Sequence, residues 1–182
     1  MRNTFILLVL GMIALSCQSA QGDRPRLQAY FDLDSLIDTQ IEILISNESE
    51  LTKTLNSQEA TEVKTTKPSR EEWENEFRLM REFNLNKPHY VGSYVANKQS
   101  GLVQYVPRQD QELPVWKFEL RYVGGQLSQI DMGLSEFKYI YINKRRATLL
   151  FSDNQLISFR IEGSQDMILK DEMNYVISGK IN

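Results

Sequence analysis

The sequence is short of the residues that build disulfides and metal sites, because its 182 residues include one cysteine and one histidine. One thiol cannot form an internal disulfide, so the chain has no disulfide framework. A structural zinc site takes four Cys or His ligands, and the sequence does not supply them. We therefore expect no metal ion and no cofactor, and a fold that depends on an ordinary hydrophobic core.

Long hydrophobic runs are also missing. The main apolar stretch, from Phe5 to Leu15, is well short of the roughly 20 residues that a membrane-spanning helix needs. Basic Arg2 precedes it and a polar segment follows it, which is the pattern of a secretory signal. The junction Ala14-Leu15-Ser16-Cys17 resembles the lipobox of bacterial lipoproteins. A conventional secretory signal, cut after Ser16, is the alternative.

The resemblance implies cleavage before Cys17 and attachment of lipid to its thiol, which gives the lone cysteine a use. Residues 1–16 would be the signal peptide, residues 17–26 a short polar tether, and residues 27–182 a single domain. Gln18 stands where aspartate would favour the inner membrane, so the resemblance implies the outer membrane of the cell envelope. The membrane would then be a partner through the lipid on Cys17.

Charge of one sign is not concentrated in the chain. The formal net charge is −3, and it becomes −4 when Arg2 leaves with the signal peptide. Proteins that bind nucleic acid neutralise phosphates with clustered Lys and Arg, so this balance argues against a nucleic-acid partner. It also argues against binding anionic headgroups by charge alone.

Two helices are predicted in the first half of the domain. Asp32 and Asp34 offer N-caps for a helix whose apolar stripe includes Ile37, Ile41 and Leu44. A second helix starts at the capping box that begins with Ser69, and we expect it to reach residues 84–87. Between the helices, residues 51–66 are interpreted as an exposed hairpin, with a longer first helix and a loop as the alternative.

After Pro88 the apolar period changes to two, which indicates strands. Gly124-Gly125 and Asp153-Asn154 are turn signals between neighbouring strands. Because the connections are too short for crossover helices, the strands should be antiparallel. We predict an α+β fold, in which the helices pack on one face of a meander sheet of about seven or eight strands. The expected strands cover residues 91–96, 101–106, 116–122, 127–132, 137–142, 147–151, 156–161 and 174–180.

No catalytic constellation is visible in the sequence. His89 lacks an identifiable orienting carboxylate, and Ser93 and Ser164 lack the glycine-flanked elbow of the hydrolases. Asp32 and Asp34 suit helix capping better than calcium binding. We predict that the protein is not an enzyme and has no catalytic residues.

Aromatic residues in the predicted strands are the candidate binding residues. They would form a platform for a sugar, peptide or partner surface, or would line a hydrophobic cavity, if they share a face. Ordinary strand packing is the alternative. The basic run Lys144-Arg145-Arg146 is interpreted as a solvated hairpin tip that a headgroup or partner could contact. The candidate contact residues are Tyr94, Tyr105, Trp116, Tyr139 and Tyr141.

The layout as a whole resembles a diffuse group of small bacterial lipoproteins, through short phrases such as Tyr30-Phe31-Asp32-Leu33 and Asn86-Lys87-Pro88. The leading hypothesis is a membrane-anchored, non-catalytic interaction or assembly module with an envelope protein partner. The alternative is a carrier of lipid or another hydrophobic ligand in a sheet cavity. A hydrolase is the third hypothesis.

Overall fold

The structure is a computed structural model that describes residues 29–109, 111–168 and 170–182. The predicted signal peptide, Cys17 and the tether lie outside these residues. Within them, no helix combines the length and the apolar character that crossing a bilayer requires.

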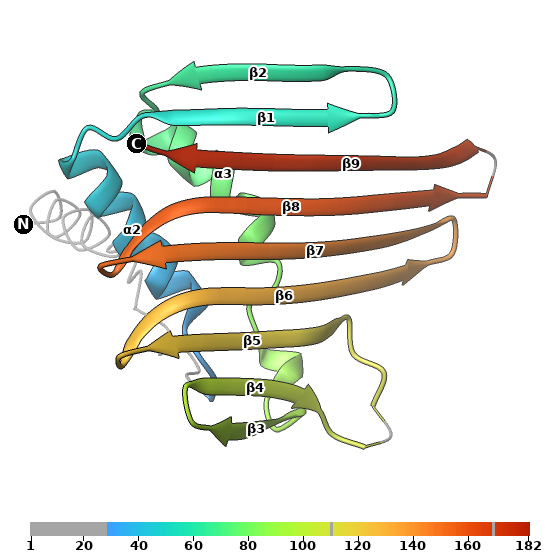
Figure 1. Cartoon of the computed structure of the whole chain (residues 1–182). Helices are drawn as coiled ribbons and strands as arrows, with labels where there is room; N and C mark the ends of the chain where they lie inside the picture. Colours follow the sequence, from blue (N-terminus) through green and yellow to red (C-terminus); the bar gives the residue numbers. More distant parts are fainter. Residues whose placement is uncertain (1–28, 110, 169) are drawn as a thin grey trace, which may run out of the picture.

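In the described part of the chain, nine antiparallel strands form one sheet, in the spatial order β2-β1-β9-β8-β7-β6-β5-β4-β3 (Figure 1). From β3 to β9 each strand pairs with the next along the chain, as in a meander. The strands are β1 (Leu51–Ser57), β2 (Thr61–Thr66), β3 (Tyr94–Gln99), β4 (Leu102–Pro107), β5 (Val115–Val123), β6 (Gln126–Lys138), β7 (Tyr141–Ser152), β8 (Gln155–Met167) and β9 (Lys170–Ile181).

The α+β class and the antiparallel sheet agree with the prediction, but the strand count does not. The segment 137–142, predicted as a strand of its own, contains the end of β6, a turn at residues 139–140 and the start of β7. The predicted hairpin at residues 51–66 is present as β1 and β2. It belongs to the sheet, because β1 pairs with the C-terminal strand β9 from Leu51↔Ile181 to Ser57↔Tyr175.

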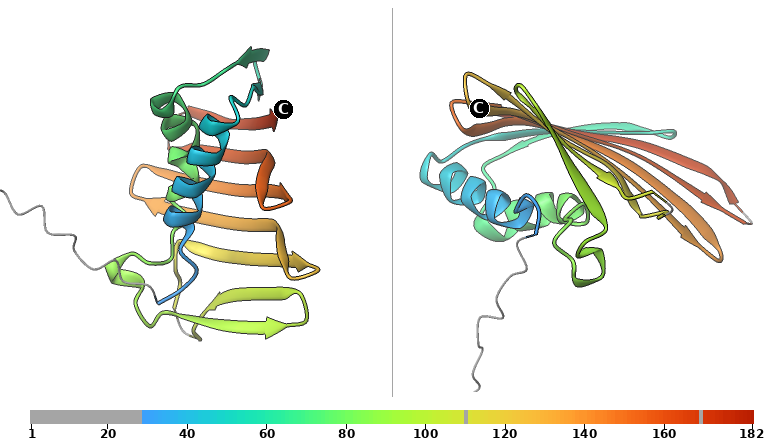
Figure 2. Two further views of the ribbon diagram at one scale, coloured as in Figure 1. Left: turned by 90° about the vertical axis from the view of Figure 1, so that its left-hand side faces the viewer. Right: turned by 90° about the horizontal axis from the view of Figure 1, so that it is seen from below.

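Two helices, α2 (Leu33–Ser46) and α3 (Arg70–Arg81), lie on the same side of the sheet (Figure 2). The Asp32 side chain accepts a hydrogen bond from the Ser35 N–H and so caps α2. Ser69 and Glu72 form a complete capping box at the start of α3. This helix ends at Arg81, earlier than predicted. A short 3-10 helix, η2 (Pro88–Tyr90), follows it.

The core lies between the helices and the sheet. Trp73, Phe77 and Met80 of α3 are almost fully buried, and the Phe77 ring meets the Phe159 ring of β8 edge-on at 5.8 Å. Gln40 of α2 accepts a hydrogen bond from the Leu156 N–H at 2.7 Å, which fixes the helix against the β7–β8 turn. A cavity between α2, α3 and the sheet, lined by Ile37, Phe77 and Leu149 among others, has a volume of about 10 Å³, roughly the room of one water molecule. This cavity is too small for an acyl chain.

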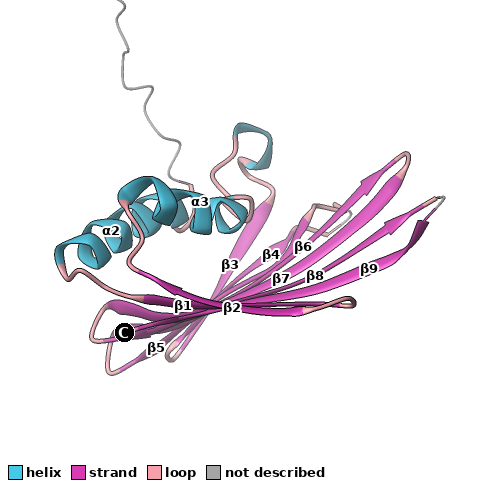
Figure 3. Ribbon diagram, turned by 90° about the horizontal axis from the view of Figure 1, so that it is seen from above, coloured by secondary structure: helices cyan, strands magenta, loops and turns pink. Residues whose placement is uncertain are grey.

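The helices cover only part of the sheet. Strands β6 to β9 continue well past them, as the view from above shows (Figure 3). The opposite face of the sheet carries neither helix (Figures 2 and 3). We call it the open face.

Candidate functional site: the open face of the sheet

Residue alternation along β7 assigns side chains to the two faces, because successive residues of a strand point to opposite sides. Arg145 is 5 % exposed, and its guanidinium lies 2.6 Å from Glu82 at the end of α3, so it points toward the helices. Its neighbours Lys144 and Arg146 are exposed and point the other way, onto the open face. Residues directly opposite one another on paired strands share a face. Lys144 therefore shares the open face with Ser135 and Ser164, which lie opposite it on the two neighbouring strands. Arg146 likewise shares this face with Glu162.

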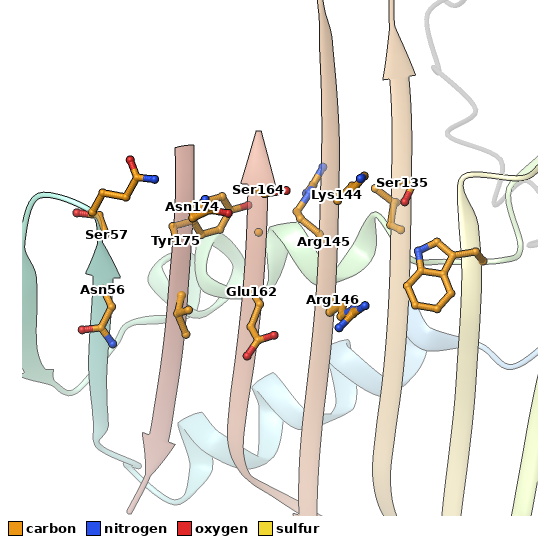
Figure 4. Close-up of a pocket in the computed structure, with 15 residues that line it drawn as sticks. Asn56, Ser57, Ser135, Lys144, Arg145, Arg146, Glu162, Ser164, Asn174 and Tyr175 are labelled. Atoms are coloured by element: carbon orange, nitrogen blue, oxygen red, sulfur yellow. The ribbon is translucent and has the colours of Figure 1, made fainter. Parts of the chain in front are cut away.

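The open face is hollowed where these side chains meet. A shallow groove of about 690 Å³ crosses the sheet from β1 to β5, with the helices behind the strands (Figure 4). Five steps between strands of 4.7–4.9 Å each make it roughly 24 Å long. The open-face side chains that line it are Asn56, Trp116, Ser135, Lys144, Arg146, Glu162, Ser164, Asn174 and Val176.

Trp116 forms one end of the groove. It occupies a register irregularity of β5, between Val115 opposite Leu134 and Lys117 opposite Gly133. Its indole ring covers Gly133 so closely that a Cβ on this glycine would collide with the ring. The Arg146 guanidinium lies 5.7 Å from the centre of the ring, within cation–π range. Trp116 is 42 % exposed, so its ring presents an aromatic surface at this end of the groove.

Two further hollows continue the groove along the same face. One, of about 370 Å³, shares Trp116, Arg146 and Glu162 with it and extends to Asp131 and Arg160. The other, of about 690 Å³, shares Thr148 and Arg160 with the second and reaches Lys180. Together they make a continuous trough over the middle of the open face.

The charges in the trough are unevenly balanced. Leaving out Arg145, which points to the helices, the lining includes five cationic and two anionic side chains. Arg160 lies 2.8 Å from Glu162, and Lys117 lies 3.2 Å from Glu119. Among the described residues, no ion pair joins a carboxylate to Lys144, Arg146 or Lys180. The charges of these three side chains are thus not neutralised by an ion pair within the described residues, and Arg146 in addition lies over the Trp116 ring.

Behind the groove, a buried network holds β7 against α3. Besides Glu82, the Arg145 guanidinium lies 3.7 Å from Glu136. In the amide orientation that satisfies both groups, the Asn143 oxygen accepts hydrogen bonds from Arg145 at 2.9 and 3.3 Å. Burial lowers the pKa of Arg145, but the hydrogen bond and charge of Glu82 outweigh it and raise this pKa above its ordinary value. Arg145 thus remains cationic and positions Lys144 and Arg146, its neighbours on the opposite face.

The five tyrosine and tryptophan residues that were predicted from the sequence as contact residues lie in different parts of the structure. Tyr94 is buried, and its hydroxyl donates a hydrogen bond to the Val115 carbonyl at 2.9 Å. Burial raises its pKa far above the ordinary tyrosine value. Tyr105 packs edge-on against Tyr30 and Phe118 in the same core. Tyr94 and Tyr105 therefore have a packing role.

Tyr139 and Tyr141 lie at the far tip of the β6–β7 hairpin, away from Trp116. Tyr139 is 96 % exposed in the turn. The neighbouring β8–β9 hairpin contacts this tip, because the Ile168 N–H donates to the Ile140 carbonyl at 3.3 Å. Of the five candidates, Trp116 is the one that lines the groove.

Most of the residues that line the groove were not among the contact residues predicted from the sequence. The run 144–146 was interpreted as a solvated hairpin tip that a headgroup or partner could contact. It lies instead within β7, with Arg145 buried and its two neighbours on the open face. The signal was present in the sequence: a basic run within alternating apolar residues is expected to divide between the two faces of a strand. No comparable sequence pattern indicates the polar groove residues Ser135, Glu162, Ser164 and Asn174.

A catalytic arrangement is not seen in the described part of the chain. His89 is exposed, its ring contacts Tyr90 at 4.1 Å, and no hydrogen bond links it to a described carboxylate or hydroxyl. Two carboxylates of α3 also have structural roles, because Glu72 takes part in helix capping and Glu76 forms an ion pair with Lys53. No cluster of three or more potential metal ligands occurs among the described residues.

Comparisons with protein families, with curated proteins and with solved structures find no match to this chain. The chemistry of its surface is therefore the basis for assigning it a function.

Proposed function

We propose that this protein is a lipid-anchored envelope protein that acts by binding, without catalysis, and that the open face of its sheet receives the partner. Anchoring comes from the resemblance of Ala14-Leu15-Ser16-Cys17 to a lipobox. The binding role is supported by one observation above all, the groove that Trp116 and Arg146 line on the face that neither α2 nor α3 covers.

The shape of the groove favours an extended partner. Enclosed sites for small molecules bury most of the ligand surface. This groove is shallow and open along a length of roughly 24 Å, from the spacing of the strands it crosses. A polymer or a protein surface can contact Trp116 and Asn56 together, whereas a small ligand would touch only part of the lining.

Site-specific photo-cross-linking in intact cells tests the proposal. We expect a photoreactive amino acid at Val176, which lines the groove, to give a discrete adduct. The matched control is Val123, an exposed valine at the β5–β6 turn outside the groove, which should not give that adduct. Arg146→Gln should weaken the adduct formed at position 176. Identical adducts from both positions, or none from position 176, would contradict a binding role for this face.

A further inference from the structure

We propose that the trough on the open face binds an acidic polysaccharide, with sugar rings stacked on Trp116 and carboxylate groups near Lys144, Arg146 and Lys180. This inference rests on the proposed function and names the chemical class of the ligand.

Charge is the first argument. The whole chain has a formal net charge of −3, yet the trough lining has five cations and two anions pointing onto the open face. Three of these cations have no carboxylate partner among the described residues. A local excess of positive charge on a negative protein attracts an anionic ligand to this face in particular.

The aromatic platform is the second argument. Trp116 lies flat over Gly133, where the sheet supports one side of the indole and leaves 42 % of the residue exposed. A flat, supported ring offers its surface for stacking against another ring. Hydroxyl and amide groups of Ser135, Ser164 and Asn174 lie along the same groove. Such groups match the many hydroxyls of a sugar chain.

The direction of the groove argues against an acidic peptide. Extended peptides usually bind by adding a strand to a free sheet edge, where backbone groups are unpaired. The groove instead crosses the interior strands β9, β8, β7 and β6, whose backbones pair on both sides. Recognition must come from side chains, which favours a ligand that has its own hydroxyls over one that needs backbone partners.

The density of charge argues against nucleic acid. Double-stranded DNA carries one charge per ~1.7 Å of its axis, whereas the whole trough has three unpaired cations and also contains Glu162 and Asp131. An anionic bilayer is also a poor match, because the basic side chains lie in a hollow and Trp116 lies flat on the sheet. An acidic sugar chain, whose charges are spaced by whole rings, suits this sparse pattern.

Calorimetric titration of the full chain in detergent micelles tests the ligand class. The probe is a linear oligogalacturonate of about ten sugars, and its methyl ester, which lacks the charge, is the matched ligand. We expect binding of the acidic form and at least about fivefold weaker binding of the ester, since one lost charge contact is worth about 1 kcal/mol. Trp116→Ala should weaken binding of the acidic form about tenfold, and Arg146→Gln about fivefold.

Two variants outside the groove serve as controls. Tyr139→Ala removes an exposed aromatic at the hairpin tip, and Lys64→Gln removes an exposed cation of β2. Both should bind like the parent chain. Circular dichroism of every variant confirms that loss of binding is not loss of the fold.

Other outcomes would overturn the ligand class. Tighter binding of a polyglutamate peptide, a single-stranded oligonucleotide or phosphatidylglycerol vesicles would assign the groove to that ligand. Failure to bind the acidic sugar at millimolar concentration, while position 176 still gives a specific cross-link in cells, would reject the polysaccharide and keep the binding module. Failure of both experiments would reject the function of the face itself.

Discussion

Individual glycines decide what can lie on each face of the sheet. Gly133 on the open face gives room to the Trp116 ring, and Gly179 on the helix side gives room to the Phe159 ring. The two positions differ in what surrounds the ring. Trp116 is 42 % exposed, whereas Phe159 is 2 % exposed and contacts Phe77 of α3. A methyl group added at each glycine therefore has different consequences.

We predict that Gly179→Ala lowers the free energy of unfolding by about 2 kcal/mol, because the buried Phe159 ring has no space to move aside. Gly133→Ala should change stability by less than about 1 kcal/mol, because the exposed Trp116 ring can shift. It should nevertheless weaken binding in the groove. Urea unfolding measures the two changes in stability. Equal losses for Gly179→Ala and Gly133→Ala would contradict the prediction, because they would show that the Trp116 ring is as constrained as the Phe159 ring.

Helix α3 shows how local sequence determines an element. Ser69 and Glu72 have the capping-box spacing, and both hydrogen bonds of that motif form, with the Ser69 N–H donating to Glu72 at 2.7 Å. This hydrogen bond, with that of the Ser69 hydroxyl, lowers the pKa of Glu72 below its ordinary value. Arg78 and Arg81 in the last turn complement the helix dipole.

The lowered pKa gives a stability that depends on pH. In the unfolded chain Glu72 has its ordinary pKa, so its contribution is complete above that value and is lost as the pH falls through the folded pKa. We predict that Glu72→Gln flattens the loss of stability at acidic pH. Glu71→Gln, in the same turn but without a hydrogen bond to Ser69, should keep the slope of the parent chain. Urea midpoints between pH 3 and 7 provide the comparison, and parallel curves for all three proteins would contradict it.

The strands show where local signals end. Gly124-Gly125 and Asp153-Asn154 adopt positive φ angles in the two turns that were predicted from them. The β6–β7 turn is formed by Tyr139 and Ile140, which are not turn residues by composition, so the sequence did not separate β6 from β7 correctly. Helix α3 was also predicted too long. Phe83 and Leu85 are buried just after its end, and their apolar pattern extends the helical period beyond Arg81.

At the scale of the whole molecule, the two ends of the domain meet in the sheet. The hairpin of β1 and β2 follows α2 early in the chain, yet it pairs with β9 at the C-terminus. This contact joins segments more than 100 residues apart, and no local pattern indicates it. The open face is a consequence of the same arrangement, because six adjacent strands must line up before the groove exists.

The proposed anchor also belongs to this scale, since it determines where the open face is displayed. We predict that full-length protein incorporates labelled palmitate and sediments with membranes, and that Cys17→Ala does neither. The thiol of Cys17 is the one thiol in the chain, so the substitution removes the single site for a thioether-linked lipid. Trp116→Ala provides the control, because it should label normally. Equal labelling of Cys17→Ala and the parent chain would refute lipidation.

The sequence by itself determined the helices, the antiparallel pairing and most turns, because caps, apolar periods and turn residues act between neighbours in the chain. It also nominated Trp116. Tertiary structure decided that Tyr94 and Tyr105 are core residues, that β1 pairs with β9, and that Lys144, Arg146 and Glu162 share a groove with Trp116. These placements depend on the register between strands that are distant in sequence. A shift of that register by one residue would move every side chain of a strand to the other face.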